Sequence, residues 1–120
     1  MIYGIGCDIC DIARIASAPE GFSSRFFTPK EQELFGMRKK QAQTVAANFA
    51  VKEAFSKALG TGISGFGLRD VEVLRDELGK PYINLYGNAE EICKNLGIEH
   101  IHVSVSHTDE LCMAYVVLEK

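Results

Sequence analysis

The chain contains no tryptophan and only three prolines among its 120 residues. It also lacks any uninterrupted apolar run of about 18 residues, the length that is typical of a membrane-spanning helix. Its first residues, MIYGIGCD, contain no basic segment of the kind that opens a secretory signal peptide. We therefore expect a cytoplasmic protein that does not associate with membranes.

Neither of two common nucleotide-binding motifs is present in its usual context. There is no G-x-x-x-x-G-K-[ST], and the one G-x-G-x-x-G, at residues 60–65, does not follow a predicted strand. The glycine-rich segment GTGISGFG, residues 60–67, follows a predicted helix instead of opening one. Its composition suits either a loop that cradles phosphate or a flexible surface loop, and the residues alone leave both interpretations open.

The charge balance excludes a general nucleic-acid-binding protein, because the net charge is −3. Basic residues nevertheless cluster in the first third of the chain, at Arg14, Arg25, Lys30 and the run 38–40. Such a cluster is either an ordinary solvated surface or a docking patch for an acidic partner.

The four cysteines do not form a recognisable metal or redox motif. Cys7 and Cys10 have C-x-x-C spacing, but no second C-x-x-C or H-x₃₋₅-H follows. In a strand, residues three apart point to opposite faces of the sheet. We therefore expect reduced and mostly buried thiols.

The length and residue pattern predict one α+β domain over residues 1–120. A chain of this length buries roughly 65% of its unfolded surface, enough for one core. Apolar alternation and turn residues predict strands, and capping signals predict helices. The expected strands are 2–10, 70–75, 81–86, 100–107 and 111–118; the expected helices are 11–18, 29–37, 41–60 and 88–96, with a loop at 19–24. We expect an antiparallel sheet with the long central helix packed across it.

The central helix has two different halves. Its small residues, such as Ala47, Ala54 and Ala58, share an apolar half that can pack closely on a sheet. The other half carries Asn48, Lys52, Glu53, Ser56 and Lys57. A Glu53–Lys57 pair at i,i+4 is by itself common on solvated helix faces and contributes only a few tenths of a kcal/mol.

Other parts of the chain favour a chemical role for this pair. Asp8 stands near the end of a strand that contains two glycines, and His107 ends a later strand. Two carboxylates with few other ligands suit Mg²⁺, which completes its shell with water and substrate phosphates. A neighbouring lysine neutralises phosphate charge. The combination points to phosphoryl chemistry.

Five segments resemble the short, bacterial holo-acyl-carrier-protein synthases, which are 4′-phosphopantetheinyl transferases. They are GIGCDICDIARI (4–15), FTPKEQELF (27–35), NFAVKEAFSKALGTG (48–62), GKPYINL (79–85) and HVSVSHTDELCMAYVV (102–117). The resemblance covers nearly the whole chain in the right order and spacing. The combination of GIG-x-DI, KEAFSKALGTG and VSVSH is highly specific for that family.

The resemblance implies the fold of that family, a homotrimer with sites at subunit interfaces, and a role in fatty acid biosynthesis. Family members move 4′-phosphopantetheine from coenzyme A to a serine of acyl carrier protein and release adenosine 3′,5′-bisphosphate. Asp8 and Glu53 match the Mg²⁺ ligands and, with Lys57, the catalytic residues. The coenzyme A contacts implied are Lys52, Ser56, Lys57, Gly60, Gly62, Pro81, His107 and Thr108, of which His107 and Thr108 come from a neighbouring subunit. Arg14 and Arg25 match the surface that docks the acidic carrier protein.

One departure from the family pattern concerns Asn48, where many relatives have an arginine near coenzyme A phosphate. Lys52 or a neighbouring subunit are the candidates to compensate. The proton acceptor for the serine stays open between a metal-bound water and a carboxylate. Two other functions remain as alternatives: a carrier-protein-binding module without catalysis, and a Mg²⁺-dependent phosphohydrolase that acts on coenzyme A.

Overall fold

The computed structural model describes residues 1–120 and shows an α+β fold with antiparallel sheets. The strands are β1 (Ile2–Asp11), β2 (Val71–Arg75), β3 (Pro81–Leu85), β4 (His100–His107) and β5 (Leu111–Glu119). The helices are α1 (Ile12–Ala16), α2 (Phe22–Phe26), α3 (Pro29–Gly36), α4 (Gln41–Leu59) and α5 (Gly87–Leu96), with a short 3₁₀ turn at Leu68–Asp70. No helix is both long enough and apolar enough to cross a bilayer.

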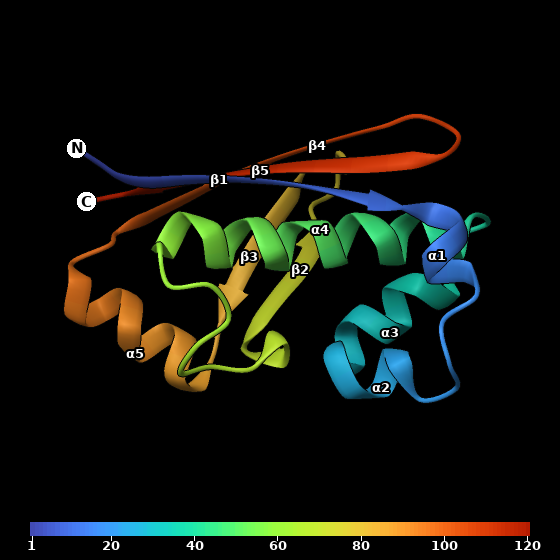
Figure 1. The fold of residues 1–120 in the computed structure, drawn as a ribbon, viewed down its shortest axis with the longest axis horizontal. Coiled ribbons are helices and arrows are strands. Elements are labelled where there is room, and N and C mark those ends of the chain that lie inside the picture. Colours follow the sequence, from blue (N-terminus) through green and yellow to red (C-terminus); the bar gives the residue numbers. More distant parts are fainter.

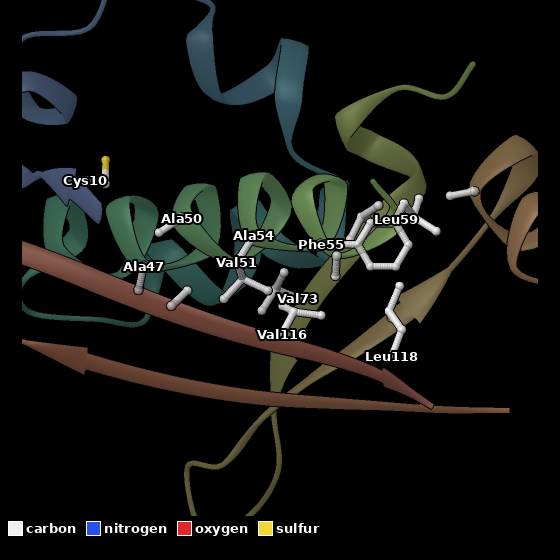
Figure 2. Close-up of a cluster of buried hydrophobic side chains, with 14 of the residues drawn as sticks. Cys10, Ala47, Ala50, Val51, Ala54, Phe55, Leu59, Val73, Val116 and Leu118 are labelled. Atoms are coloured by element: carbon white, nitrogen blue, oxygen red, sulfur yellow. The ribbon is translucent and has the colours of Figure 1, made fainter. Parts of the chain in front are cut away.

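The helix α4 lies between two separate sheets (Figure 1). A three-stranded sheet in the order β1-β5-β4 covers one side of the helix, and the hairpin β2-β3 crosses its other side. Figure 2 shows the resulting core, in which Val51 of α4, Val73 of the hairpin and Val116 of β5 gather in one cluster. The predicted sheet is therefore confirmed as antiparallel, but the hairpin forms a second layer of its own.

Strand β1 approaches α4 unusually closely because its helix-facing residues are glycines. A Cβ atom placed on Gly6 would lie 2.0 Å from the carbonyl oxygen of Ala54, and one on Gly4 would lie 2.0 Å from that of Ala58. Real carbon and oxygen atoms cannot approach so closely, so neither position accepts a side chain without moving backbone. The prediction that small helix residues such as Ala54 and Ala58 pack closely on a sheet is confirmed.

The alternation along β1 places the large apolar side chains on the outer face of the sheet. Ile5, Cys7 and Ile9 are exposed, whereas Gly6 and Cys10 are buried against the helix layer. Cys7 and Cys10 thus point to opposite faces, as predicted, and they form no disulfide. Cys93 and Cys112 are buried, which leaves Cys7 as the exposed exception among the four thiols.

The helix signals in the first third of the chain are largely confirmed. Asp11 caps α1, and Thr28 and Glu31 form the predicted capping box of α3. The expected loop at 19–24 is partly wrong, because Phe22 begins the short helix α2. The Phe22 ring packs edge-on against Phe26 at 5.1 Å between centroids. Aromatic burial therefore orders a segment whose glycine and serines favour a loop.

The contact between β1 and α4 is tested by Gly6→Ala. The added methyl group meets helix backbone, which cannot rotate away, so we expect the free energy of unfolding to fall by about 3 kcal/mol or more. Chemical denaturation monitored by circular dichroism measures this change. Gly36→Ala is the matched control, because no atom lies within 4 Å of a Cβ at Gly36. Equal stability of the two variants would contradict the close packing.

Candidate functional site

Asp8, Glu53 and Lys57 come together at the outer edge of the three-stranded sheet. The Lys57 ammonium donates to Asp8 Oδ1 at 3.0 Å and to the backbone oxygen of Cys7 at 3.0 Å. The lysine side chain is 54% exposed and the aspartate side chain 18%. Glu53 is half-buried one helical turn before Lys57. The three predicted catalytic side chains thus form one group that solvent can reach.

Local geometry explains why these residues meet. Glu53 and Lys57 are four residues apart on α4, so they lie on the same helix face. Asp8 follows Gly4 and Gly6 at two-residue intervals and therefore shares their helix-facing side of β1. Because the two glycines hold β1 against Ala54 and Ala58, the Asp8 carboxylate reaches the neighbouring Glu53 and Lys57.

The group carries more negative than positive charge. Burial raises the pKa of the Glu53 carboxyl, and the nearby Asp8 carboxylate raises it further. The hydrogen bond to Asp8 raises the pKa of the Lys57 ammonium, as does the charge of the same carboxylate. Two carboxylates therefore compete for one ammonium, an arrangement that favours an added cation.

The donor set fits a hard divalent cation better than a soft one. Asp8 and Glu53 offer only carboxylate oxygens, the ligands that Mg²⁺ prefers. No group of three or more histidine, cysteine, aspartate and glutamate side chains is arranged to hold a metal. A cation held here would thus take two protein ligands and leave its other positions to water or to substrate oxygens.

A cavity and a glycine loop adjoin these three residues. The cavity, of about 370 Å³, is lined by Lys57 together with Cys7 and Tyr115 from the outer face of the sheet. Gly60 caps α4, and its backbone nitrogen donates to the carbonyl oxygen of Lys57 at 3.0 Å. Gly60 and Gly62 are exposed and both have positive φ. These predicted contact residues therefore lie close to Lys57.

His107, Thr108 and Pro81 lie elsewhere in the molecule. His107 ends β4, which is the opposite edge strand of the sheet from β1. Thr108 follows it in the β4–β5 turn, and Pro81 opens β3, which packs beside β4. One chain therefore presents the predicted site in two parts: one at the β1 edge of the three-stranded sheet, and the other at its β4 edge with Pro81 on the neighbouring hairpin.

The expectation that Lys52 and Ser56 contact a bound ligand is not retained. Lys52 is fully buried, and its ammonium donates to Glu31 Oε1 at 2.7 Å and to the carbonyl oxygens of Leu68 and Val71. The Ser56 hydroxyl is 1% exposed and donates to the carbonyl oxygen of Glu53 at 2.6 Å. Neither polar group has a free path to a ligand.

Asn48 is buried in the same network as Lys52. Its amide nitrogen donates to Glu31 Oε2 at 3.0 Å and to the carbonyl oxygen of Val73 at 2.8 Å. Lys52 therefore does not replace the arginine expected at position 48. The interpretation of this helix half as a polar face is wrong for Asn48, Lys52 and Ser56, because the β2-β3 hairpin and α3 cover it.

The predicted docking residues are accessible. Arg14 on α1 and Arg25 on α2 are exposed, and neither forms an ion pair within the chain. The Arg25 guanidinium lies 5.2 Å from the centroid of the Phe26 ring, a cation–π arrangement. Both positive charges are thus free to meet an acidic surface.

Comparisons with known proteins show the family to which this chain is similar. Residues 4–116 match the model of the 4′-phosphopantetheinyl transferase superfamily. The chain is 52% identical to the holo-[acyl-carrier-protein] synthase of Clostridium botulinum (strain Alaska E43 / Type E3), with 99% of this chain and 98% of the relative covered.

Solved structures show the same fold. The holo-[acyl-carrier-protein] synthase of Neisseria meningitidis superposes with a TM-score of 0.92 at 36% identity, and the match covers 100% of both chains. The Helicobacter pylori synthase in complex with coenzyme A gives a TM-score of 0.83 at 32% identity, covering 96% of this chain and 99% of the other.

The buried role of Lys52 is tested by Lys52→Met. The substitution keeps a long, unbranched side chain but leaves the Glu31 carboxylate without its cation, so we expect a loss of about 3–5 kcal/mol in the free energy of unfolding. Urea denaturation provides the measurement. Lys94→Met, on the exposed face of α5, should change stability by less than about 0.5 kcal/mol. A similarly small effect at Lys52 would overturn the structural role.

Proposed function

The chain belongs to the 4′-phosphopantetheinyl transferase superfamily, and on this premise we propose that it converts apo acyl carrier protein to its holo form. The group transferred is the 4′-phosphopantetheine of coenzyme A. The observation that carries the assignment to this site is the meeting of Asp8, Glu53 and Lys57 beside an open cavity. Two carboxylates and a lysine at one accessible position suit a reaction on a diphosphate.

In the proposed reaction, the serine hydroxyl of the carrier protein attacks the phosphorus that bears pantetheine. The bond from that phosphorus to the bridging oxygen breaks, and adenosine 3′,5′-bisphosphate leaves. The serine proton passes to the base at the site and from there to solvent. The reaction is a substitution at phosphorus, so no oxidation state changes. Such transfers depend mainly on positioning and on stabilisation of charge. Lys57, whose ammonium stays protonated beside Asp8, is placed to contact the diphosphate oxygens.

We assign the Mg²⁺ site of this reaction to Asp8 and Glu53. The ion, when bound, supplies Lewis-acid stabilisation of the diphosphate. The chain supports this with oxygen ligands only and with a Glu53 carboxyl whose pKa is raised by burial and, further, by the nearby Asp8 carboxylate. Lys57, which now hydrogen-bonds Asp8, would then be free to turn toward the substrate.

The separation of the two half-sites supports a shared site between subunits. A second copy that packs the end of its β4 over the β1 edge and the outer sheet face of the first would bring His107 and Thr108 toward Lys57. The outer sheet face is suited to such contact, because Ile5 is 68% exposed, Ile9 58% and Tyr115 53%. A closed ring of three copies repeats this contact three times, and we propose a homotrimer of this kind.

We further propose that the carrier protein docks on α1 and α2. The unpaired guanidinium groups of Arg14 and Arg25 complement an acidic partner, and electrostatic attraction of this type raises the rate of encounter. The neighbouring half-buried Phe22 and Ile15 add apolar surface, and they line a cavity of about 550 Å³ between α1, α2 and the start of α4.

The transfer reaction is tested with the variant Glu53→Gln. The change removes one ligand charge but almost no volume, so we expect the fold to persist and the rate to fall by at least about 100-fold. Intact mass spectrometry of apo acyl carrier protein, incubated with coenzyme A and Mg²⁺, measures the gain of one phosphopantetheine.

The controls for this assay separate the competing functions. Glu91→Gln, an exposed change on α5, should transfer at the wild-type rate, and EDTA should stop the wild-type protein. Retained transfer by Glu53→Gln would refute the metal assignment. Wild-type protein that binds the carrier without modifying it would be a binding module, and free phosphopantetheine formed without carrier would indicate a hydrolase.

The shared site is tested by mixing two inactive variants, Lys57→Ala and His107→Ala. If each site takes Lys57 from one subunit and His107 from the next, co-expressed chains should rebuild about a quarter of the sites by random assembly in a ring. Measured transfer by the mixture, compared with each variant alone, gives the answer. A mixture as inactive as its components would place both residues in one subunit's site.

A further inference from the structure

We infer that Gln43 is a positioning residue that fixes the imidazole of His107 with its Nε2–H directed toward the coenzyme A-binding cleft. This inference rests on the proposed function, since it gives His107 a defined task in that site. The observation is a contact between two residues 64 positions apart: Gln43 Nε2 lies 3.1 Å from His107 Nδ1. Neither the helix-capping signals nor the strand pattern of the sequence predicts this contact of Gln43.

Gln43 is itself held firmly against the β4-β5 hairpin. It lies in the first turn of α4 and is half-buried. Its backbone carbonyl accepts a hydrogen bond from the thiol of Cys112 at 3.4 Å. Cys112 is fully buried and is the cross-strand partner of His107 in the sheet. The backbone of Gln43 is therefore fixed relative to the strand end that carries His107.

The hydrogen bond sets the tautomer of the imidazole. With the amide nitrogen of Gln43 donating, His107 Nδ1 must act as the acceptor. The proton of the neutral ring then resides on Nε2, which is left without a partner inside the chain. A glutamine carries no charge, so its effect on the ring is one of orientation through this hydrogen bond.

The surroundings of His107 give this tautomer a use. His107 is exposed at the end of β4, where the strand end borders a cavity of about 100 Å³ that Thr108 and Met113 also line, while its imidazole lies on the helix-facing side with Gln43. The Thr108 hydroxyl accepts from the backbone nitrogens of Glu110 and Leu111, so the adjoining turn is ordered. A fixed N–H donor there suits an oxygen of a phosphate, whereas a ring with a bare Nε2 would face that oxygen with a lone pair.

A ring that is already oriented binds more tightly than one that must be ordered on binding. Fixing a free side chain costs affinity equivalent to roughly three- to tenfold in binding. Gln43→Leu keeps the side-chain size but removes the hydrogen bond. We expect it to raise KM for coenzyme A roughly three- to tenfold, with kcat and KM for the carrier protein close to wild type. Gln41→Leu, an exposed glutamine on the same helix that borders the proposed docking surface, is the matched control for KM of coenzyme A.

A second readout does not depend on catalysis. Nitrogen-15 NMR of histidine-labelled protein reports which ring nitrogen carries the proton, and a His107→Gln sample identifies the His107 signals among those of the three histidines. We expect a single Nε2–H tautomer for His107 in the wild-type protein and in Gln41→Leu, and a mixture of tautomers in Gln43→Leu.

The two readouts separate failure of this inference from failure of the proposed function. An Nδ1–H tautomer in the wild-type protein, or an unchanged spectrum in Gln43→Leu, would overturn the positioning role. So would an unchanged KM for coenzyme A in Gln43→Leu while the wild-type protein is active. Absence of transfer by the wild-type protein would instead refute the proposed function, and the NMR spectra would still decide the tautomer.

Discussion

The close contact between β1 and α4 is the constraint on which the rest of the structure depends. Glycines at positions 4 and 6 let the strand rest directly on the helix backbone at Ala54 and Ala58. That spacing, and not a long side chain, brings Asp8 within hydrogen-bond distance of Lys57. A side chain at Gly6 would lift the strand and separate the carboxylate from the helix. The same contact between strand and helix therefore determines both the packing of the core and the geometry of the candidate site.

The same alternation has a consequence on the opposite face of the strand. Because the glycines take the helix-facing positions, Ile5 and Ile9 must point outward, where they are largely exposed. An isolated chain would leave this apolar surface in water. The arrangement that brings Asp8 to Lys57 thus also leaves an apolar surface, which in our proposal receives another copy of the chain. Under that proposal, catalysis and association both depend on the residue pattern of a single strand.

Features that depend on near neighbours in the chain were predictable from the sequence. The capping box at Thr28 involves only four consecutive residues. The two faces of each strand follow from the alternation of side chains along it. The buried network was not predictable from the sequence. Lys52 bonds Glu31, which lies 21 residues earlier in the chain, and the hairpin that covers Lys52 lies later in the chain. The contact between Gln43 and His107 spans 64 residues and carries no pattern of its own. Whether a polar residue of α4 is buried depends on the layer that packs against it. The spacing of residues within the helix does not reveal which layer that is.

The two lysines of KEAFSK show how a short segment serves two purposes. Five residues along a helix correspond to a rotation of about 140°, so Lys52 and Lys57 project in very different directions. Lys52 faces the hairpin with Asn48, where a buried carboxylate and two carbonyl oxygens hold it. Lys57 faces β1 and the solvent with Glu53. The resemblance of this segment to the family motif therefore covers two separate roles, one in the buried network and one at the candidate site. Only the helix face toward β1 is open to a substrate. A charged residue in such a segment belongs to the site only when the helix turns it toward the cleft.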